Sequence, residues 1–71
     1  MRRFVAKDGA LWDAVVGHES GGTFVVLFTP AAGGDPRKVV LAEEWALAAE
    51  TELGEKTDED LRAMLEQSNP W

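Results

Sequence analysis

The sequence contains no cysteine and a single histidine, His18. Without cysteine the chain cannot form a disulfide framework, a thiolate zinc site or an iron–sulfur cluster, and it cannot use a thiol nucleophile. One histidine also excludes a multi-histidine metal site within one chain. We therefore expect no metal ion bound by cysteine or histidine ligands.

Basic residues are few as well, with seven Lys and Arg against 13 Asp and Glu, which gives a net charge of −6. This balance disfavours a general nucleic-acid binder, since such proteins need a basic surface to meet phosphates. Long apolar runs are also missing. Lys7 interrupts the apolar run after Arg3, and glycines and a proline break the uncharged stretch 20–34. We expect no signal peptide, no membrane segment and a cytoplasmic location.

What the chain does have is an ordinary globular composition, with 45% apolar and 28% charged residues. Its 71 residues allow one domain, 1–71, with a thin core. Four segments resemble β-strands: 2–6, 10–17, 23–29 and 37–41. The third is the strongest. It is apolar on both faces, which predicts a central strand covered on both sides.

The links between these segments are short. Asp8-Gly9 predicts a hairpin with a type I′ turn between the first two strands. In the second strand Trp12, Ala14 and Val16 share one face, but the other face also carries apolar residues. Arg37 and Lys38 predict that the fourth strand lies at an edge of the sheet.

The hydrophobic period becomes helical after Ala42. A first helix is predicted over 43–53, with Trp45, Ala49 and Leu53 on one side and Gly54 as the residue that stops it. Thr57 followed by Asp60 resembles a capping box that starts a second helix. The apolar stripe of that helix contains Leu61, Met64, Leu65 and Ser68, and Asn69-Pro70 ends it.

The sequence thus predicts an α+β fold, a four-stranded antiparallel meander followed by two C-terminal helices on one face. The alternative is a small barrel-like sheet with a helical tail. We expect Phe24, Val26 or Phe28 to be buried together with Trp45 and with Leu61, Met64 or Leu65. Trp12 and Trp45 are expected to join sheet and helix.

No segment forms a convincing catalytic or cofactor motif. The Gly-x-x-x-x-Gly-Thr pattern of 17–23 lacks the lysine of a phosphate loop and precedes a strand rather than a helix. His18-Glu19-Ser20 places three consecutive residues where a hydrolase triad needs separate positions. Asp58-Glu59-Asp60 fits a helix start better than a cation loop. We expect a non-enzymatic protein without a cofactor or metal.

The charge distribution is the clearest functional hint. Residues 1–42 carry five basic and four acidic side chains, whereas residues 43–71 carry two basic and nine acidic ones. The acidic half is either a solvated surface, the mark of an acid-biased source, or a docking face for a basic protein. For that face we predict the partner-binding residues Glu43, Glu44, Glu50, Asp58, Glu59, Asp60 and Trp71. Trp71 has two other interpretations, since it either folds back over an apolar patch or is frayed.

The leading hypothesis is a protein-interaction or regulatory module that binds a protein partner or a second copy of itself. The alternative is a small nucleic-acid-associated regulator. It either touches phosphates with Arg2, Arg3, Arg37 and Lys38 or uses its acidic helices to mimic nucleic acid.

Overall fold

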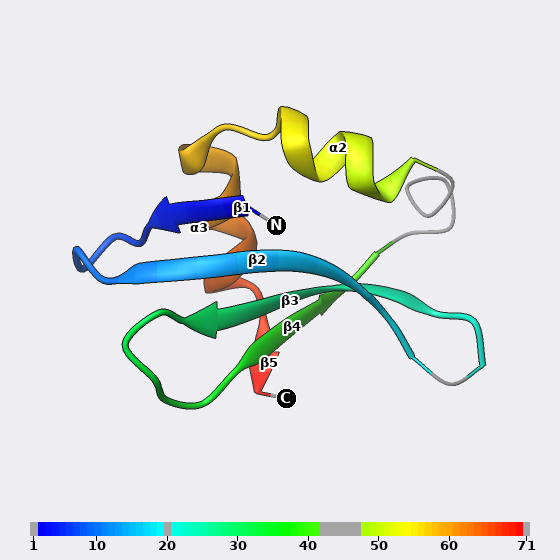
Figure 1. Cartoon of the computed structure of the whole chain (residues 1–71), viewed down its shortest axis with the longest axis horizontal. Helices are drawn as coiled ribbons and strands as arrows, with labels where there is room; N and C mark the ends of the chain where they lie inside the picture. The colour runs from blue at the N-terminus through cyan, green and yellow to red at the C-terminus, as the bar shows by residue number, and fades with distance from the viewer. Residues whose placement is uncertain (1, 20, 42–47, 71) are drawn as a thin grey trace.

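The computed structural model describes residues 2–19, 21–41 and 48–70 of the 71-residue chain. Within these ranges a sheet is followed by two helices, and a short last strand then returns to the sheet (Figure 1). The elements are β1 Arg2–Val5, β2 Leu11–His18, β3 Phe24–Pro30, β4 Arg37–Val40, α2 Ala49–Glu55, α3 Asp58–Glu66 and β5 Asn69–Pro70. The predicted α+β fold, an antiparallel sheet followed by C-terminal helices, is confirmed.

The sheet is a meander in which each strand pairs antiparallel with the next, in the order β1-β2-β3-β4-β5. Its third strand, β3, is central, as predicted. The prediction that β4 lies at an edge is wrong for its basic half. Arg37 pairs with Pro70 and Lys38 with Asn69, because the chain returns from α3 and adds β5 outside β4.

The first hairpin is confirmed, but its turn is not type I′. That turn needs two residues with positive φ, and among the described residues only glycines have one; here it is Gly9, with φ +89. The Gly9 N–H donates to the Ala6 carbonyl at 2.9 Å, and the Ala6 N–H donates to the Ala10 carbonyl at 2.7 Å. The Asp8 carboxylate accepts from the Ala10 N–H at 3.0 Å, so its side chain stabilises a three-residue loop with one left-handed position.

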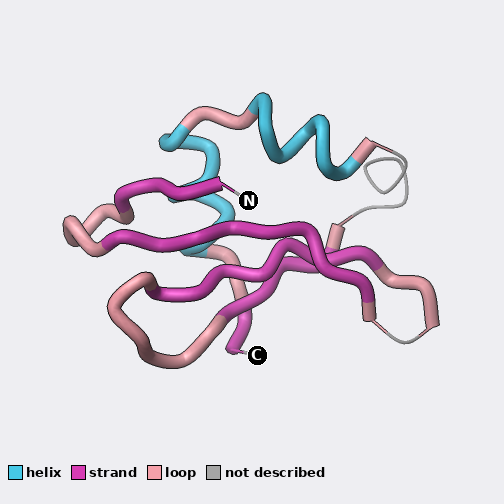
Figure 2. Tube along the Cα trace, viewed as in Figure 1, coloured by secondary structure: helices cyan, strands magenta, loops and turns pink. Residues whose placement is uncertain are grey.

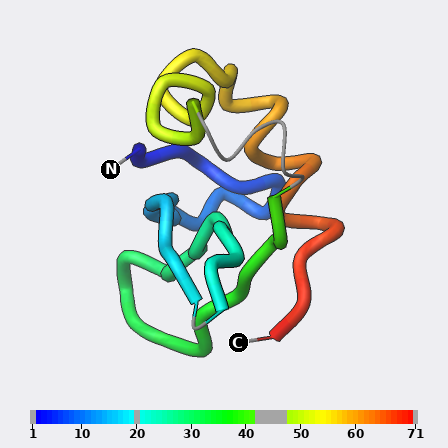
Figure 3. The backbone as a smooth tube through the Cα atoms, turned by 90° about the vertical axis from the view of Figure 1, so that its right-hand side faces the viewer, coloured from blue at the N-terminus to red at the C-terminus, as the bar shows by residue number. Residues whose placement is uncertain are grey.

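One face of the sheet packs against the helices, and the end-on view in Figure 3 separates the helical layer from the strands. The buried cluster between the layers contains Phe4, Ala14, Val26, Phe28, Leu41, Ala49, Leu53 and Leu61. Val26, Phe28 and Leu61 are therefore buried as predicted. Trp12, Phe24, Met64 and Leu65 are half-buried against this cluster. The expectation for Trp45 lies outside the described residues.

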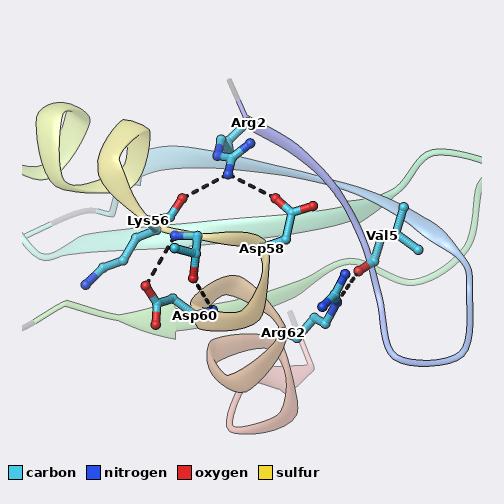
Figure 4. Close-up of polar contacts among 7 residues, drawn as sticks. Arg2, Val5, Lys56, Asp58, Asp60 and Arg62 are labelled. Carbon is cyan, nitrogen blue, oxygen red and sulfur yellow. Dashed lines mark hydrogen bonds and ion pairs between the residues drawn. The ribbon is translucent and has the colours of Figure 1, made fainter.

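A short link joins the two helices. The sequence predicts a helix stop at Gly54 and a capping box at Thr57, and the structure contains only the capping box. Thr57 Oγ1 accepts from the Asp60 N–H at 3.1 Å, and Asp60 Oδ2 accepts from the Thr57 N–H at 3.2 Å (Figure 4). The predicted capping box is thus confirmed. Gly54 does not stop the first helix. It lies inside α2, because Lys56 leaves the helix in an extended conformation, φ −67 and ψ 141, that leads directly to the Thr57 cap.

Candidate protein-interaction surfaces

The side of the sheet away from the helices carries exposed apolar side chains. Alternation along a strand sends Phe4, Ala14 and Val26 into the core, so their neighbours point the other way. We call this side the open sheet face. Its exposed or half-buried apolar side chains are those of Val5, Leu11, Val15, Leu27 and Val40. Figure 2 shows the described helices on only one side of the strands that carry it.

Four of these apolar residues form two cross-strand pairs, which the Arg3 and Asp13 pair separates along β1 and β2, and Val40 pairs with the buried Val25. Val5 pairs with Leu11 on β2, and Val15 pairs with Leu27 on β3. Val15 is 37% exposed, Leu11 45% and Val40 58%, although all three are large apolar residues. The prediction that β3 is covered on both sides holds at Val25, which is 1% exposed, but Leu27 is only half-buried. The open sheet face is therefore an apolar surface that the described part of the fold leaves in solvent.

Gly17 allows side chains of β3 to approach the backbone of β2 on this face. A Cβ atom at Gly17 would lie 2.8 Å from Leu27 Cδ1 and 3.3 Å from a Val25 methyl carbon, so these two side chains fill the space where a side chain would stand. Glycine inside a strand marks such a close approach. The Leu27 side chain of β3 therefore lies over the backbone of β2 at Gly17.

Two ion pairs complete the open sheet face. Arg3 donates through Nε to Asp13 Oδ1 at 2.9 Å and through Nη2 to Oδ2 at 3.2 Å. The hydrogen bond from Arg3 lowers the pKa of the Asp13 carboxyl below its ordinary value, and the same contact raises the pKa of Arg3. Lys38 Nζ pairs with Glu19 Oε2 at 2.9 Å. Each ion pair has no net charge, so the charges of these four side chains on the open sheet face cancel.

The predicted acidic docking face divides into two kinds of residue. Asp58 Oδ1 accepts from Arg2 Nη2 at 2.9 Å, and Asp60 belongs to the capping box, so both carboxylates hold the fold together (Figure 4). Glu50 and Glu59 are exposed, and neither has an ion pair or side-chain hydrogen bond with the described residues. The remaining predicted residues, Glu43, Glu44 and Trp71, lie outside the described residues.

The four cations that the nucleic-acid hypothesis needs all have contacts within the fold. Arg2 also donates to the Lys56 carbonyl at 2.9 Å, and Arg3 and Lys38 form the ion pairs of the open sheet face. Arg37 donates to Ser68 Oγ at 2.7 Å and to the Ser68 carbonyl at 2.5 Å. These contacts hold the first strand to the helices and β4 to the segment after α3.

Parts of the two outer strands are blocked from pairing with another sheet. Arg62 Nε on α3 donates to the Val5 carbonyl of β1 at 2.6 Å (Figure 4), which occupies one backbone acceptor of that strand. At the other edge, β5 has two residues, and one is Pro70, which has no N–H to donate. A short edge strand, a proline and a covering side chain are common means of preventing edge-to-edge association.

His18, which follows the predicted strand 10–17, is the last residue of β2 and is exposed. The His18 ring stacks on Phe24 with a centroid distance of 4.7 Å, beside a hollow of about 310 Å³ that residues 48–51, at the start of α2, also line. In the described ranges no group of three or more His, Asp or Glu side chains is arranged to hold a metal ion.

Sequence reasoning identified the acidic helices but missed the open sheet face as a surface. The available signal was Leu11 and Val15 on the second face of the second strand, next to a third strand apolar on both faces. Comparison of the chain with protein-family models, with curated proteins and with solved structures finds no match. Across the described segments, no helix has the length and apolar character needed to cross a membrane.

Proposed function

We propose that this protein is a small, non-enzymatic protein-interaction module that binds through its open sheet face. The observation that carries the proposal is the exposure of Val5, Leu11, Val15 and Val40, at 37–58%, on β1, β2 and β4 of one face. Large exposed apolar side chains that gather on one face, here with two ion pairs among them, mark surfaces that another molecule covers. Single exposed apolar residues need no explanation, but a cross-strand group of them does.

Four basic side chains already form contacts within the fold, and this favours a protein over a nucleic acid as the partner. Arg2, Arg3, Arg37 and Lys38 each contact an oxygen of the fold, so a phosphate would have to compete with contacts already made. A nucleic-acid surface also requires a positive potential. The open sheet face has no net charge, which suits an apolar protein surface. The other form of the nucleic-acid alternative, mimicry by the acidic helices, does not involve this face.

A photo-crosslinking amino acid at position 40 tests the proposal in source cells. Val40 is 58% exposed, so a benzoylphenylalanine there keeps the core intact. We expect protein adducts on irradiation, because a bound partner covers this position. The matched control carries the crosslinker at Ala63, an exposed residue of α3. Absence of adducts from position 40, or the same adducts from both positions, would contradict the proposal.

A second candidate function is docking of a basic protein on the helices. It is favoured by Glu50, Glu55 and Glu59, which are exposed and have no ion-pair partner among the described residues. Such docking is steered by long-range attraction, so association should slow as salt shortens the screening length from about 30 Å at 0.01 M to about 10 Å at 0.1 M.

The measurement for this second function is the association rate with a basic protein captured from the source cells. We expect the Glu50→Gln/Glu59→Gln variant to associate several-fold more slowly at low salt. Asp35→Lys, in the loop between β3 and β4, makes the same change in net charge and should leave the rate close to that of the wild type. A rate that responds neither to salt nor to the double substitution would show that these carboxylates only keep the protein soluble.

A further inference from the structure

We propose that the occupant of the open sheet face is a second copy of this chain, packed face to face in a symmetric homodimer. This inference rests on the proposed function and deepens it by naming the partner. Two sheets that stack with their apolar faces about 10 Å apart form a sandwich core, and each copy would supply one of its two layers.

The first argument is the charge of the surfaces that could meet. The chain has a net charge of −6, and residues 48–70 carry seven acidic side chains against two basic ones. Two copies therefore repel each other when their helical sides approach. The open sheet face carries Arg3 with Asp13 and Lys38 with Glu19, so it is the neutral side of an acidic protein. A neutral face favours neither a basic nor an acidic partner, but it removes the repulsion between identical chains.

The second argument is that these charges suit a twofold contact. The Arg3 side chain is 58% exposed, whereas that of Asp13 is 19% exposed. In a symmetric dimer every contact occurs twice, so Arg3 of each copy can donate to Asp13 of either copy without leaving an unpaired charge. Asp13 is ionised at neutral pH, and the hydrogen bond from Arg3 lowers its pKa further below the ordinary value. The ion pair, which lies between Leu11 and Val15 on this face, would therefore keep its hydrogen-bond partners inside such an interface.

The third argument is that pairing through the sheet edges is limited in part. Arg62 occupies one carbonyl of β1, and Pro70 limits pairing along β5, although no described strand pairs with the outer side of Val39 and Val40 on β4. On the face itself, Leu27 lies over Gly17 and beside Val15. Face-to-face association is the arrangement that would bury these apolar side chains.

The size of the face sets the expected strength. With a rise of about 3.3 Å and a strand spacing of about 4.8 Å, β1 to β4 cover roughly 350–400 Å² of sheet plane. A standard interface buries about 800 Å² per partner, so this dimer should be weak. We expect a dissociation constant on the order of 10–100 µM rather than nanomolar.

Sedimentation velocity from about 5 µM to about 1 mM tests the inference. We expect the wild type to pass from monomer to dimer across this range. Val15→Glu and Val40→Glu should each weaken the dimer by about tenfold or more, because each buries an unpaired carboxylate. Ala63→Glu adds the same charge on α3 and should dimerise like the wild type. Circular dichroism establishes that each variant is folded, and Val40→Glu provides the test if Val15→Glu unfolds the sheet.

Two results would overturn the inference. The first is a wild type that stays monomeric to about 1 mM. The second is a dimer that both Val15→Glu and Val40→Glu leave unchanged, since another surface must then form it. The proposed function can be correct even if the homodimer is excluded. If position 40 crosslinks only to other proteins while the chain stays monomeric, the homodimer is excluded and the interaction module stands.

Discussion

Truncation of Phe28 to alanine is expected to remove a large part of the protein's free energy of unfolding at 25 °C. Phe28 lies on the central strand with none of its surface exposed, and its ring meets the edge of Phe4 at a centroid distance of 5.9 Å. Loss of a buried phenylalanine costs about 3–5 kcal/mol, because the removed ring leaves a cavity. A chain of this size has roughly 4–10 kcal/mol of stability in total. Urea unfolding followed by tryptophan fluorescence measures the change.

Val40→Ala is the matched control for Phe28→Ala. It also removes apolar side-chain carbons from the sheet, but Val40 is 58% exposed and lies on the open sheet face. The free energy of unfolding of the Val40→Ala variant should stay within about 0.5 kcal/mol of the wild-type value at low protein concentration. Equal destabilisation by Phe28→Ala and Val40→Ala would mean that the two faces of the sheet are not distinguished by the helices, and the structure described above would be wrong.

Leu61→Ala should have the second-largest effect, because it loosens the packing of α3 on the sheet. Leu61 is fully buried and lies in the same cluster as Phe4 and Phe28. Truncating a buried leucine costs about 2–5 kcal/mol, with the higher values where the site cannot collapse. We expect a shift of the urea midpoint to a much lower concentration, with loss of helical signal in the same transition as loss of the sheet.

Ala63→Gly separates this packing effect from helix propensity. Ala63 is exposed on the same helix, so glycine there lowers stability only through the backbone, by about 1 kcal/mol. If Leu61→Ala costs no more than Ala63→Gly, then α3 is not held to the sheet by its apolar side. The ratio of the two effects therefore measures how firmly the helix is docked.

Local sequence signals predicted the elements that depend on local physics. The β-branched and aromatic run of 23–29 became the central strand, and the Thr57–Asp60 spacing became a capping box with both hydrogen bonds formed. Both predictions rest on interactions within a few residues. That is also why the apolar stripe of the second helix, with Leu61 as its buried residue, could be identified from periodicity.

One error arose where a distant part of the chain decides, and two arose from contacts within a few residues. Asn69-Pro70 signalled a helix end, and only the approach of β4, helped by the Arg37 contact with Ser68, makes it a strand. Gly54 signalled a stop, but the Thr57 cap follows too closely for a left-handed turn to be needed. Asp8-Gly9 signalled a two-residue turn, and the Asp8 hydrogen bond to Ala10 stabilises a three-residue loop instead.

The two candidate surfaces also differ in how far the sequence alone predicts them. Composition identified the acidic helices, yet it could not tell that Asp58 is held by Arg2 while Glu50 and Glu59 remain without ion pairs in the described ranges. The open sheet face was harder to recognise. Its residues come from four strands, and whether a second apolar face is covered depends on where the helices pack.

Methyl NMR over a dilution series tests directly whether two copies of the chain bind each other through the open sheet face. The account predicts that the methyl signals of Val15, Leu27 and Val40 shift as concentration rises, while those of Leu53 and Leu61, buried under the helices, stay constant. The measurement locates the contact without any substitution. Shifts confined to the helices and their loops, or no shift up to about 1 mM for any methyl group, would contradict the account.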